Sequence, residues 1–325
     1  MTPRWPGRRH RTFFTTAARY ALTEHLRNRF AMVLMALFIP VWTALAFWSV
    51  PDTRTRFRLR ATGNLLTPHG NQLTEITGAL NAVTLIIGFM MFAASFAGGR
   101  FDRRLALAGY PRTHLVLAKL TSLTLASAAV AAYTTALTCA FWRPEQPALL
   151  AAALFLAGIT YGALGVAFGS LLRREVEGMF AVVMTSVIDL ALQNPLYSSS
   201  SNGSIVRYLP SYGAMQAATG AGFSTTPLPK YLAIQTGWFA AAALVGLLAF
   251  HIRTRNSLGR TRPHAIAPPT TDVPRRPRPS RAGPPRPSAQ SDDPAGPVDA
   301  DRCHVCAARD RHYGRGRRRL AWKGR

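Results

Sequence analysis

Six apolar runs alternate with polar, mostly basic segments along the first 255 residues of the chain. An α-helix needs ~20 residues to cross the ~30 Å hydrocarbon layer of a bilayer, and most of the runs reach that length. The sequence therefore predicts an all-α integral membrane protein with six transmembrane helices, at residues 31–50, 76–97, 115–141, 148–171, 179–195 and 231–252.

The basic segment before the first run, residues 1–30, predicts an interfacial helix. Between Thr12 and Phe30, helical spacing places small and aromatic residues on one face, namely Phe14, Ala17, Ala18 and Ala21. A basic amphipathic helix directly before a span lies in the plane of the lipid headgroups, as an elbow helix. A plain basic flank that only orients the first span explains the same residues equally well.

Three polar residues within the predicted spans are candidates for a translocation pathway. They are Asn81 in the second span, and Asp189 and Gln193 in the fifth. Polar groups in a membrane are costly and often functional. An alternative for Asp189 is that it lies shallow enough, near Pro195, to reach water on the outer side.

The fourth span carries glycines at Gly-x-x-x-Gly spacings, namely Gly158, Gly162, Gly165 and Gly169. Small residues let helix backbones approach closely in lipid. We therefore expect this face to pack against another helix, either within the chain or at a dimer seam.

The charges predict an orientation. The net charge is +25, from 39 basic and 14 acidic residues, and basic clusters lie at residues 100–112, 173–174 and 253–255. Positive charge beside a span marks the cytoplasmic side, so both termini are expected on the cytoplasmic side of the cell membrane. The exception is an outer loop with alternating arginines, Arg54, Arg56, Arg58 and Arg60, which form either a solvated stripe or an anion-binding one.

Residues 253–325 are rich in Pro, Arg, Ser and Gly and poor in large aliphatic residues. Such a composition predicts a disordered cytoplasmic tail. Cys303 and Cys306 have only His312 nearby as a third ligand, too few for a structural zinc site, so no cofactor is expected in this chain. The terminal basic cluster suits lipid or RNA only electrostatically, without specific nucleic-acid binding.

The segment between the second and third spans combines positive charge with apolar residues. It contains Arg103, Arg104, Leu105, Leu107, Gly109, Tyr110, Pro111 and Arg112. The leucines suit a short surface helix that the glycine ends and the proline follows. Such a segment on the cytoplasmic face suits docking of a soluble partner, although a solvated basic loop that only fixes topology has the same residues.

This segment resembles the cytoplasmic coupling helix of ABC-2-type transporter permeases, the membrane subunits of many bacterial ABC exporters. The predicted elbow helix resembles theirs, and so do the Asn194-Pro195 step and the short helix predicted within residues 208–216. The resemblance covers residues 11–255 and rests on layout. It implies a separate ATP-binding subunit docked on residues 103–112, a second permease copy that completes the pathway, and membrane lipid around both.

The chain lacks a nucleotide site of the usual kind. A P-loop needs Gly-Lys, and none of its lysines, Lys119, Lys230 and Lys323, follows a glycine. ATP would therefore be hydrolysed on the partner, and the chain is expected to be a transport subunit rather than an enzyme. The alternative is a non-transporting membrane scaffold, immunity or sensory protein that docks another partner. Nothing in the apolar spans selects a drug, lipid, peptide or polysaccharide as substrate.

Overall fold

The computed structural model describes residues 12, 15–20, 22–23, 27, 29–108, 110, 112–194, 196 and 204–255. These residues belong to one unit of the chain, which ends at Ala265. Their elements, in chain order, are α2 (Arg29–Trp48), β1 (Phe57–Arg58), β2 (Leu65–Leu66), α3 (Gly70–Leu107), α4 (Arg112–Phe141), α5 (Pro147–Leu171), α6 (Glu175–Gln193), the 3₁₀ helix η2 (Ser204–Tyr208), α7 (Tyr212–Phe223) and α8 (Pro229–Arg255).

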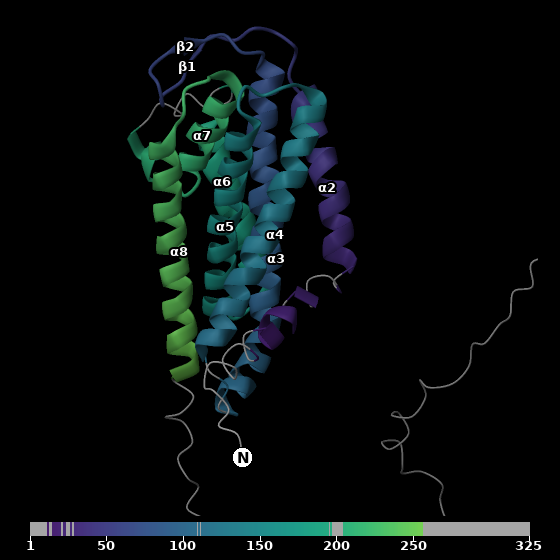
Figure 1. Ribbon diagram of the computed structural model, residues 1–325, viewed down its shortest axis with the longest axis vertical. Coiled ribbons are helices and arrows are strands. Elements are labelled where there is room, and N and C mark those ends of the chain that lie inside the picture. The colour runs from purple at the N-terminus through teal and green to yellow at the C-terminus, as the bar shows by residue number, and fades with distance from the viewer. Residues whose placement is uncertain are drawn as a thin grey trace, which may run out of the picture. The chain divides into compact units, whose positions relative to one another are not determined.

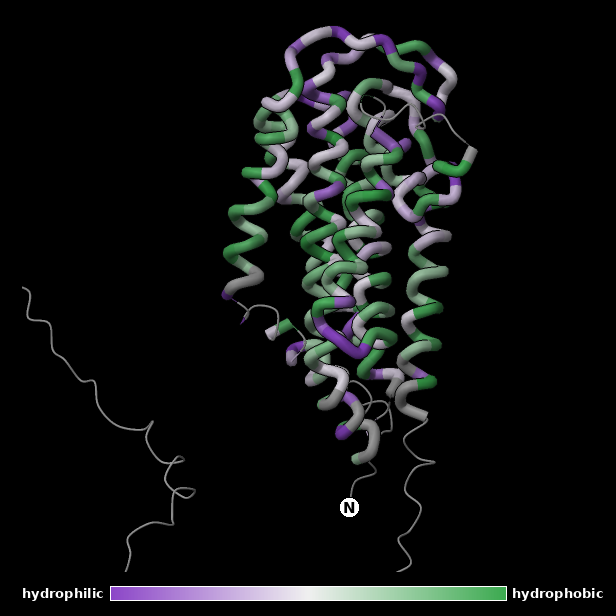
Figure 2. Tube along the Cα trace, turned by 180° about the vertical axis from the view of Figure 1, so that it is seen from behind, coloured by the Kyte–Doolittle hydropathy of each residue, from purple (hydrophilic) through white to green (hydrophobic). Residues whose placement is uncertain are grey.

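Four of the helices contain a stretch that is long and apolar enough to cross a membrane. The stretches are Gly70–Gly99, Thr113–Phe141, Pro147–Leu171 and Pro229–Ala249, which match the second, third, fourth and sixth predicted spans. Hydrophobic residues predominate along the length of these helices, and hydrophilic residues are more frequent toward their ends (Figure 2). The helical, membrane-type architecture is therefore confirmed for the described residues.

The other two predicted spans are helical, but their crossing of a membrane remains a prediction. The apolar part of α2 is the shorter stretch Met32–Trp48. The first turn of α6 carries Glu175 and Glu177, and its last turns carry buried Asp189 and Gln193.

α5 is the central helix of the described bundle, because it contacts α3, α4, α6, α7 and α8 (Figure 1). Its buried Leu154 belongs to a hydrophobic core with Leu80 and Ile87 of α3 and Leu123 of α4. α7 is also an interior element, since most of its side chains are buried. The short helix predicted within residues 208–216 is present as α7, which begins at Tyr212, directly after Ser211, and continues beyond the predicted end to Phe223.

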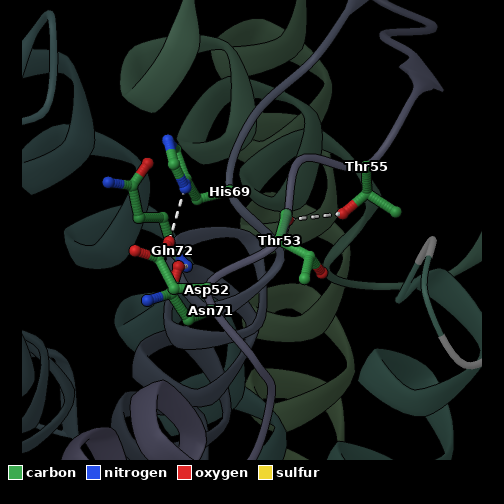
Figure 3. A network of polar contacts seen from close by, with 6 residues as sticks. All are labelled: Asp52, Thr53, Thr55, His69, Asn71 and Gln72. Atoms are coloured by element: carbon green, nitrogen blue, oxygen red, sulfur yellow. Dashed lines mark hydrogen bonds and ion pairs between the residues drawn. The ribbon is translucent and has the colours of Figure 1, made fainter.

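A two-stranded hairpin covers one end of the bundle, which we call the hairpin end (Figure 1). Its turn contains Gly63, whose φ of +75° favours glycine. Both ends of the loop are anchored close to α3. His69 Nδ1 lies 2.5 Å from Asp52 Oδ1 (Figure 3). Gly70 N–H donates to Thr53 O at 2.9 Å. The predicted alternation is observed for three of the four arginines: the side chains of Arg54, Arg56 and Arg58 are exposed, Leu59 is buried, and Arg60 is half-buried.

α3 is longer at both ends than the span predicted at residues 76–97. It has 38 residues and runs without interruption from Gly70 to Leu107. Residues 101–107 are therefore the last turns of this helix, and the separate surface helix predicted there is wrong. The helix continues because its end is held by a contact with α4, described below, which no local signal in the sequence reveals.

The two ends of the chain are only partly described. Residues 12, 15–20, 22–23 and 27 are helical, with Ala17 and Ala18 half-buried and Arg19 and Arg27 exposed. This pattern agrees with an amphipathic helix, but its place at a membrane surface remains a prediction. The predicted tail begins too early at residue 253, because Arg253–Arg255 belong to α8, and residues 256–325 with Cys303 and Cys306 lie outside the described residues.

Candidate functional site

The predicted docking segment lies at the opposite end of the bundle from the hairpin, which we call the arginine end. Tyr110 N–H donates to Leu105 O at 3.0 Å, a bond that closes the last turn of α3. Arg104 is exposed, whereas Leu105 and Tyr110 are half-buried. Burial raises the pKa of the Tyr110 hydroxyl above its ordinary value.

The remaining predicted docking residues are only partly visible. Gly109 and Pro111 lie outside the described residues, and so do the side chains of Arg103, Leu107 and Arg112. The backbone nevertheless places Arg103 and Leu107 in the last turns of α3 and Arg112 at the start of α4. The segment therefore joins two membrane-type helices directly.

The arginine end also contains an ion pair that sequence reasoning missed. Lys119 Nζ of α4 donates to Asp102 Oδ2 of α3, and the side chains are 25% and 10% exposed. A cavity of about 410 Å³ beside this pair is lined by residues of α3, α4 and the N-terminal helical segment, including Tyr20. The Tyr20 and Phe101 rings stack there, with centroids 5.6 Å apart.

Asn81, the first pathway candidate, contributes to a polar cluster between α3 and α6. Its Nδ2 donates to Ser186 Oγ at 3.2 Å, and the Thr84 hydroxyl lies 2.7 Å from the same oxygen. All three residues are buried. In an apolar surrounding, these bonds favour one relative position of the two helices.

Asp189 and Gln193 lie in a second polar cluster, which joins α5, α6 and α7. Asp189 Oδ2 accepts from the Tyr161 hydroxyl and, at 2.9 Å, from Ser211 N–H. Asp189 Oδ1 accepts from Gln193 Nε2 at 2.6 Å. Because Asp189 is only 2% exposed and both of its oxygens are occupied, the alternative that it reaches outer water is wrong. Its surroundings are those of a structural anchor.

A cavity of about 470 Å³ lies beside the first of these clusters, between α2, α3 and α6. Its polar lining residues are Ser49, Thr74, Thr77, Asn81 and Asn194. Its rim includes the exposed side chains of Trp42, Leu45 and Val187, so it opens toward the side of the bundle. Of the three predicted pathway residues, the structure places only Asn81 on this cavity, because Asp189 and Gln193 interact with α5 and α7 instead.

The four glycines of α5 face other helices of the same chain. A Cβ at Gly165 would lie 2.4 Å from Gly88 O of α3, and one at Gly169 would lie 2.9 Å from Phe92 O. A Cβ at Gly162 would meet Leu123 of α4, and Gly158 lies against Ser127 and Val83. The close approach serves packing within the chain.

Two further buried polar contacts join helices that are far apart in the sequence. The first joins α8 to α5 and α7, and the second lies near the hairpin end. Gln235 of α8 donates to Thr160 Oγ1 at 2.8 Å and accepts from Ala214 N–H at 2.9 Å. Trp142 Nε1 donates to Glu75 Oε2 at 2.6 Å, and Glu75 is fully buried. A glutamine in a span and an acid at the mouth of another are visible signals, but their partners lie too far away in the sequence to be inferred.

No group of three or more His, Cys, Asp or Glu side chains suited to a metal ion occurs within the described part of the chain. The comparisons with known proteins leave the chain without an assigned family. No family model matches the sequence, and no curated protein matches it.

Proposed function

We propose that this chain is the membrane-embedded subunit of an ABC exporter of the ABC-2 permease type, with ATP hydrolysed by a separate subunit docked at the arginine end. The proposal includes six membrane-crossing helices, formed by α2, α3, α4, α5, α6 and α8, with α7 on the outer side. Its support is the order of the elements and the character of the two ends.

The observation that carries the proposal is the extension of α3 beyond its apolar part. Its 38 residues correspond to about 57 Å, well above the ~30 Å hydrocarbon thickness of a bilayer. The apolar stretch ends at Gly99, so Arg100–Leu107 project from it as a basic helical end. A projecting, positively charged helix end with the half-buried Leu105 and Tyr110 close to its tip suits a partner with an acidic rim and an apolar groove.

The cavity between α2, α3 and α6 is the proposed half of a pathway. It opens to the side of one chain, and a second copy facing it would close it. Its lining contains polar Thr74, Thr77, Asn81 and Asn194 among apolar residues and no charged side chain among the described residues. This lining favours an uncharged or amphipathic substrate over a strongly ionic one.

Co-expression with a candidate ATP-binding subunit and purification in detergent test the proposal. We expect the two chains to co-purify and to hydrolyse Mg·ATP together, with no hydrolysis by this chain alone. Replacement of residues 103–110 by a Gly-Ser linker of equal length should abolish co-purification while the protein still accumulates in membranes. Persistence of the complex with the linker, or co-purification of a partner without ATPase activity, would contradict the proposal and favour a scaffold role.

A further inference from the structure

The ion pair between Asp102 and Lys119 joins the end of α3 to the beginning of α4. Both side chains are largely covered, in contrast to the pair His69–Asp52 in the hairpin loop, where the aspartate side chain is 69% exposed. A covered ion pair resists solvent screening, and removing one partner leaves an uncompensated charge. The contact is therefore well suited to hold the two helix ends at a fixed distance.

The position of Asp102 in the sequence supports an internal role. It is the only acidic residue between Arg100 and Arg112, and Arg103 and Arg104 follow it directly. An acid on a basic docking surface would repel an acidic partner. Asp102 is instead buried against α4, so the exposed Arg104 side chain keeps its charge available at the surface.

A second contact attaches the N-terminal helical segment to the same place. Phe101, next to Asp102, stacks on Tyr20 with ring planes 25° apart. The cavity beside the ion pair is lined by Thr16 and Ala17 as well as by Leu105 and Tyr110. One cluster thus contacts the N-terminal segment, the last turns of α3, the turn and the first turns of α4.

We infer that Asp102 and Lys119 are positioning residues that keep the ends of α3 and α4 together as one rigid unit, so that motion of a docked ATP-binding subunit reaches both helices at once. This inference rests on the function proposed above. It assigns the transmission of motion to the contact between Asp102 and Lys119, which is distinct from the surface that docks the partner.

The first experiment measures rigidity without any partner. Spin labels on Arg104→Cys and Thr113→Cys, in a full-length chain with Cys139, Cys303 and Cys306 replaced by serine, report the distance across the turn. We expect a single narrow distribution that broadens in Asp102→Asn and in Lys119→Gln. It should narrow again in the exchanged pair Asp102→Lys with Lys119→Asp. Asp52→Asn, which removes the exposed pair of the hairpin loop, is the matched control and should leave the distribution unchanged.

The second experiment measures coupling in the complex. Labels on Leu45→Cys and Val187→Cys span the cavity, and their distance is compared without nucleotide and with ATP and vanadate. Asp102→Asn should still co-purify with the ATP-binding subunit and hydrolyse ATP. Its nucleotide-dependent distance change should be largely lost, because removing one partner of a covered pair releases the contact between the two helix ends. The exchanged pair should restore it.

The outcomes separate the inference from the function on which it rests. A narrow distribution in Asp102→Asn, or a broadened one with an undiminished response at the cavity, would overturn the positioning role and leave the proposed function standing. Failure of the unmodified chain to bind any ATP-binding subunit would overturn the function, whereas the distances across the turn would still show whether the pair holds the helix ends.

Discussion

Asp189 accepts the backbone N–H of Ser211 at 2.9 Å, so a carboxylate of α6 holds the residue that directly precedes α7. The same oxygen accepts the Tyr161 hydroxyl of α5. Three helices therefore meet at one side chain within an apolar bundle. The N-terminal end of a helix carries partial positive charge, which further stabilises a carboxylate at this place.

Replacement of Asp189 by alanine should destabilise the protein strongly. The change removes one acceptor from each of three buried donors, in Tyr161, Gln193 and Ser211, and each bond to a charged group contributes ~1.5–3 kcal/mol. We expect a clear fall in the thermal unfolding temperature, measured in detergent by tryptophan fluorescence. Asp189→Asn keeps one acceptor and should lose less. Equal stability of wild type and Asp189→Ala would show that α7 is held by other contacts.

Substitution of Gly165 by alanine should separate α5 from α3. The new Cβ would lie 2.4 Å from Gly88 O, a backbone atom that cannot turn away, and overpacking of this kind costs ~1–3 kcal/mol. Gly237→Ala in α8 is the matched control, because nothing lies within 4 Å of its new Cβ. The control should be neutral or slightly stabilised in the same unfolding assay. A similar loss in both variants would point to helix propensity and contradict the packing explanation.

Trp142→Phe should show how much the hydrogen bond to Glu75 contributes to the free energy of unfolding. Phenylalanine can keep the stacking on Phe223, whose ring lies 5.3 Å away, but it cannot donate to the buried carboxyl group. Loss of this donor should cost ~1–3 kcal/mol of unfolding free energy. Glu75→Gln retains an acceptor for Trp142 and should cost less. If the glutamine variant is the less stable of the two, this ranking is wrong.

Charge reversal at Arg104 should weaken the proposed complex in a salt-dependent way. Arg104 is exposed at the end of α3, and exposed charges are screened within ~10 Å at 0.1 M salt. Arg104→Glu should therefore reduce affinity for the ATP-binding subunit more at low salt than at high salt, as measured by surface-immobilised binding. Arg207→Glu changes an exposed charge near the hairpin end and should have no effect. The same loss at all salt concentrations would argue against an electrostatic contact.

Hydropathy was sufficient to locate α3, α4, α5 and α8, because each carries a long apolar stretch whose length is set by the bilayer. It also drew attention to Asn81 and Asp189, since polar residues stand out in apolar runs. Their environments could not be predicted. Asn81 of α3 faces the cavity and Asp189 of α6 faces α5, a difference that depends on how each helix is rotated about its axis, and rotation follows from packing rather than from local sequence.

The hydrogen-bond partners of the polar residues could not be predicted from the sequence either. Trp142 and Glu75 are separated by 67 positions, and Gln235 and Thr160 by 75. The end of α3 was misplaced for a related reason: its last turns contain Asp102, whose partner Lys119 lies on the following helix. The local sequence does not distinguish a surface loop from the end of a long helix. The distinction depends on a contact with another helix, here the ion pair of Asp102 with Lys119.

The unbroken course of α3 has a mechanical consequence. The helix contains no proline, and its closest approach to α5, where Gly165 meets Gly88, lies near the middle of its length. If α3 tilts as a rigid helix about this contact, a sideways push near Leu107 would move Asn71 and Glu75 in the opposite direction. Gly88 lies nearly midway between the two ends of α3, so the displacement at the hairpin end would be about as large as the displacement at the arginine end.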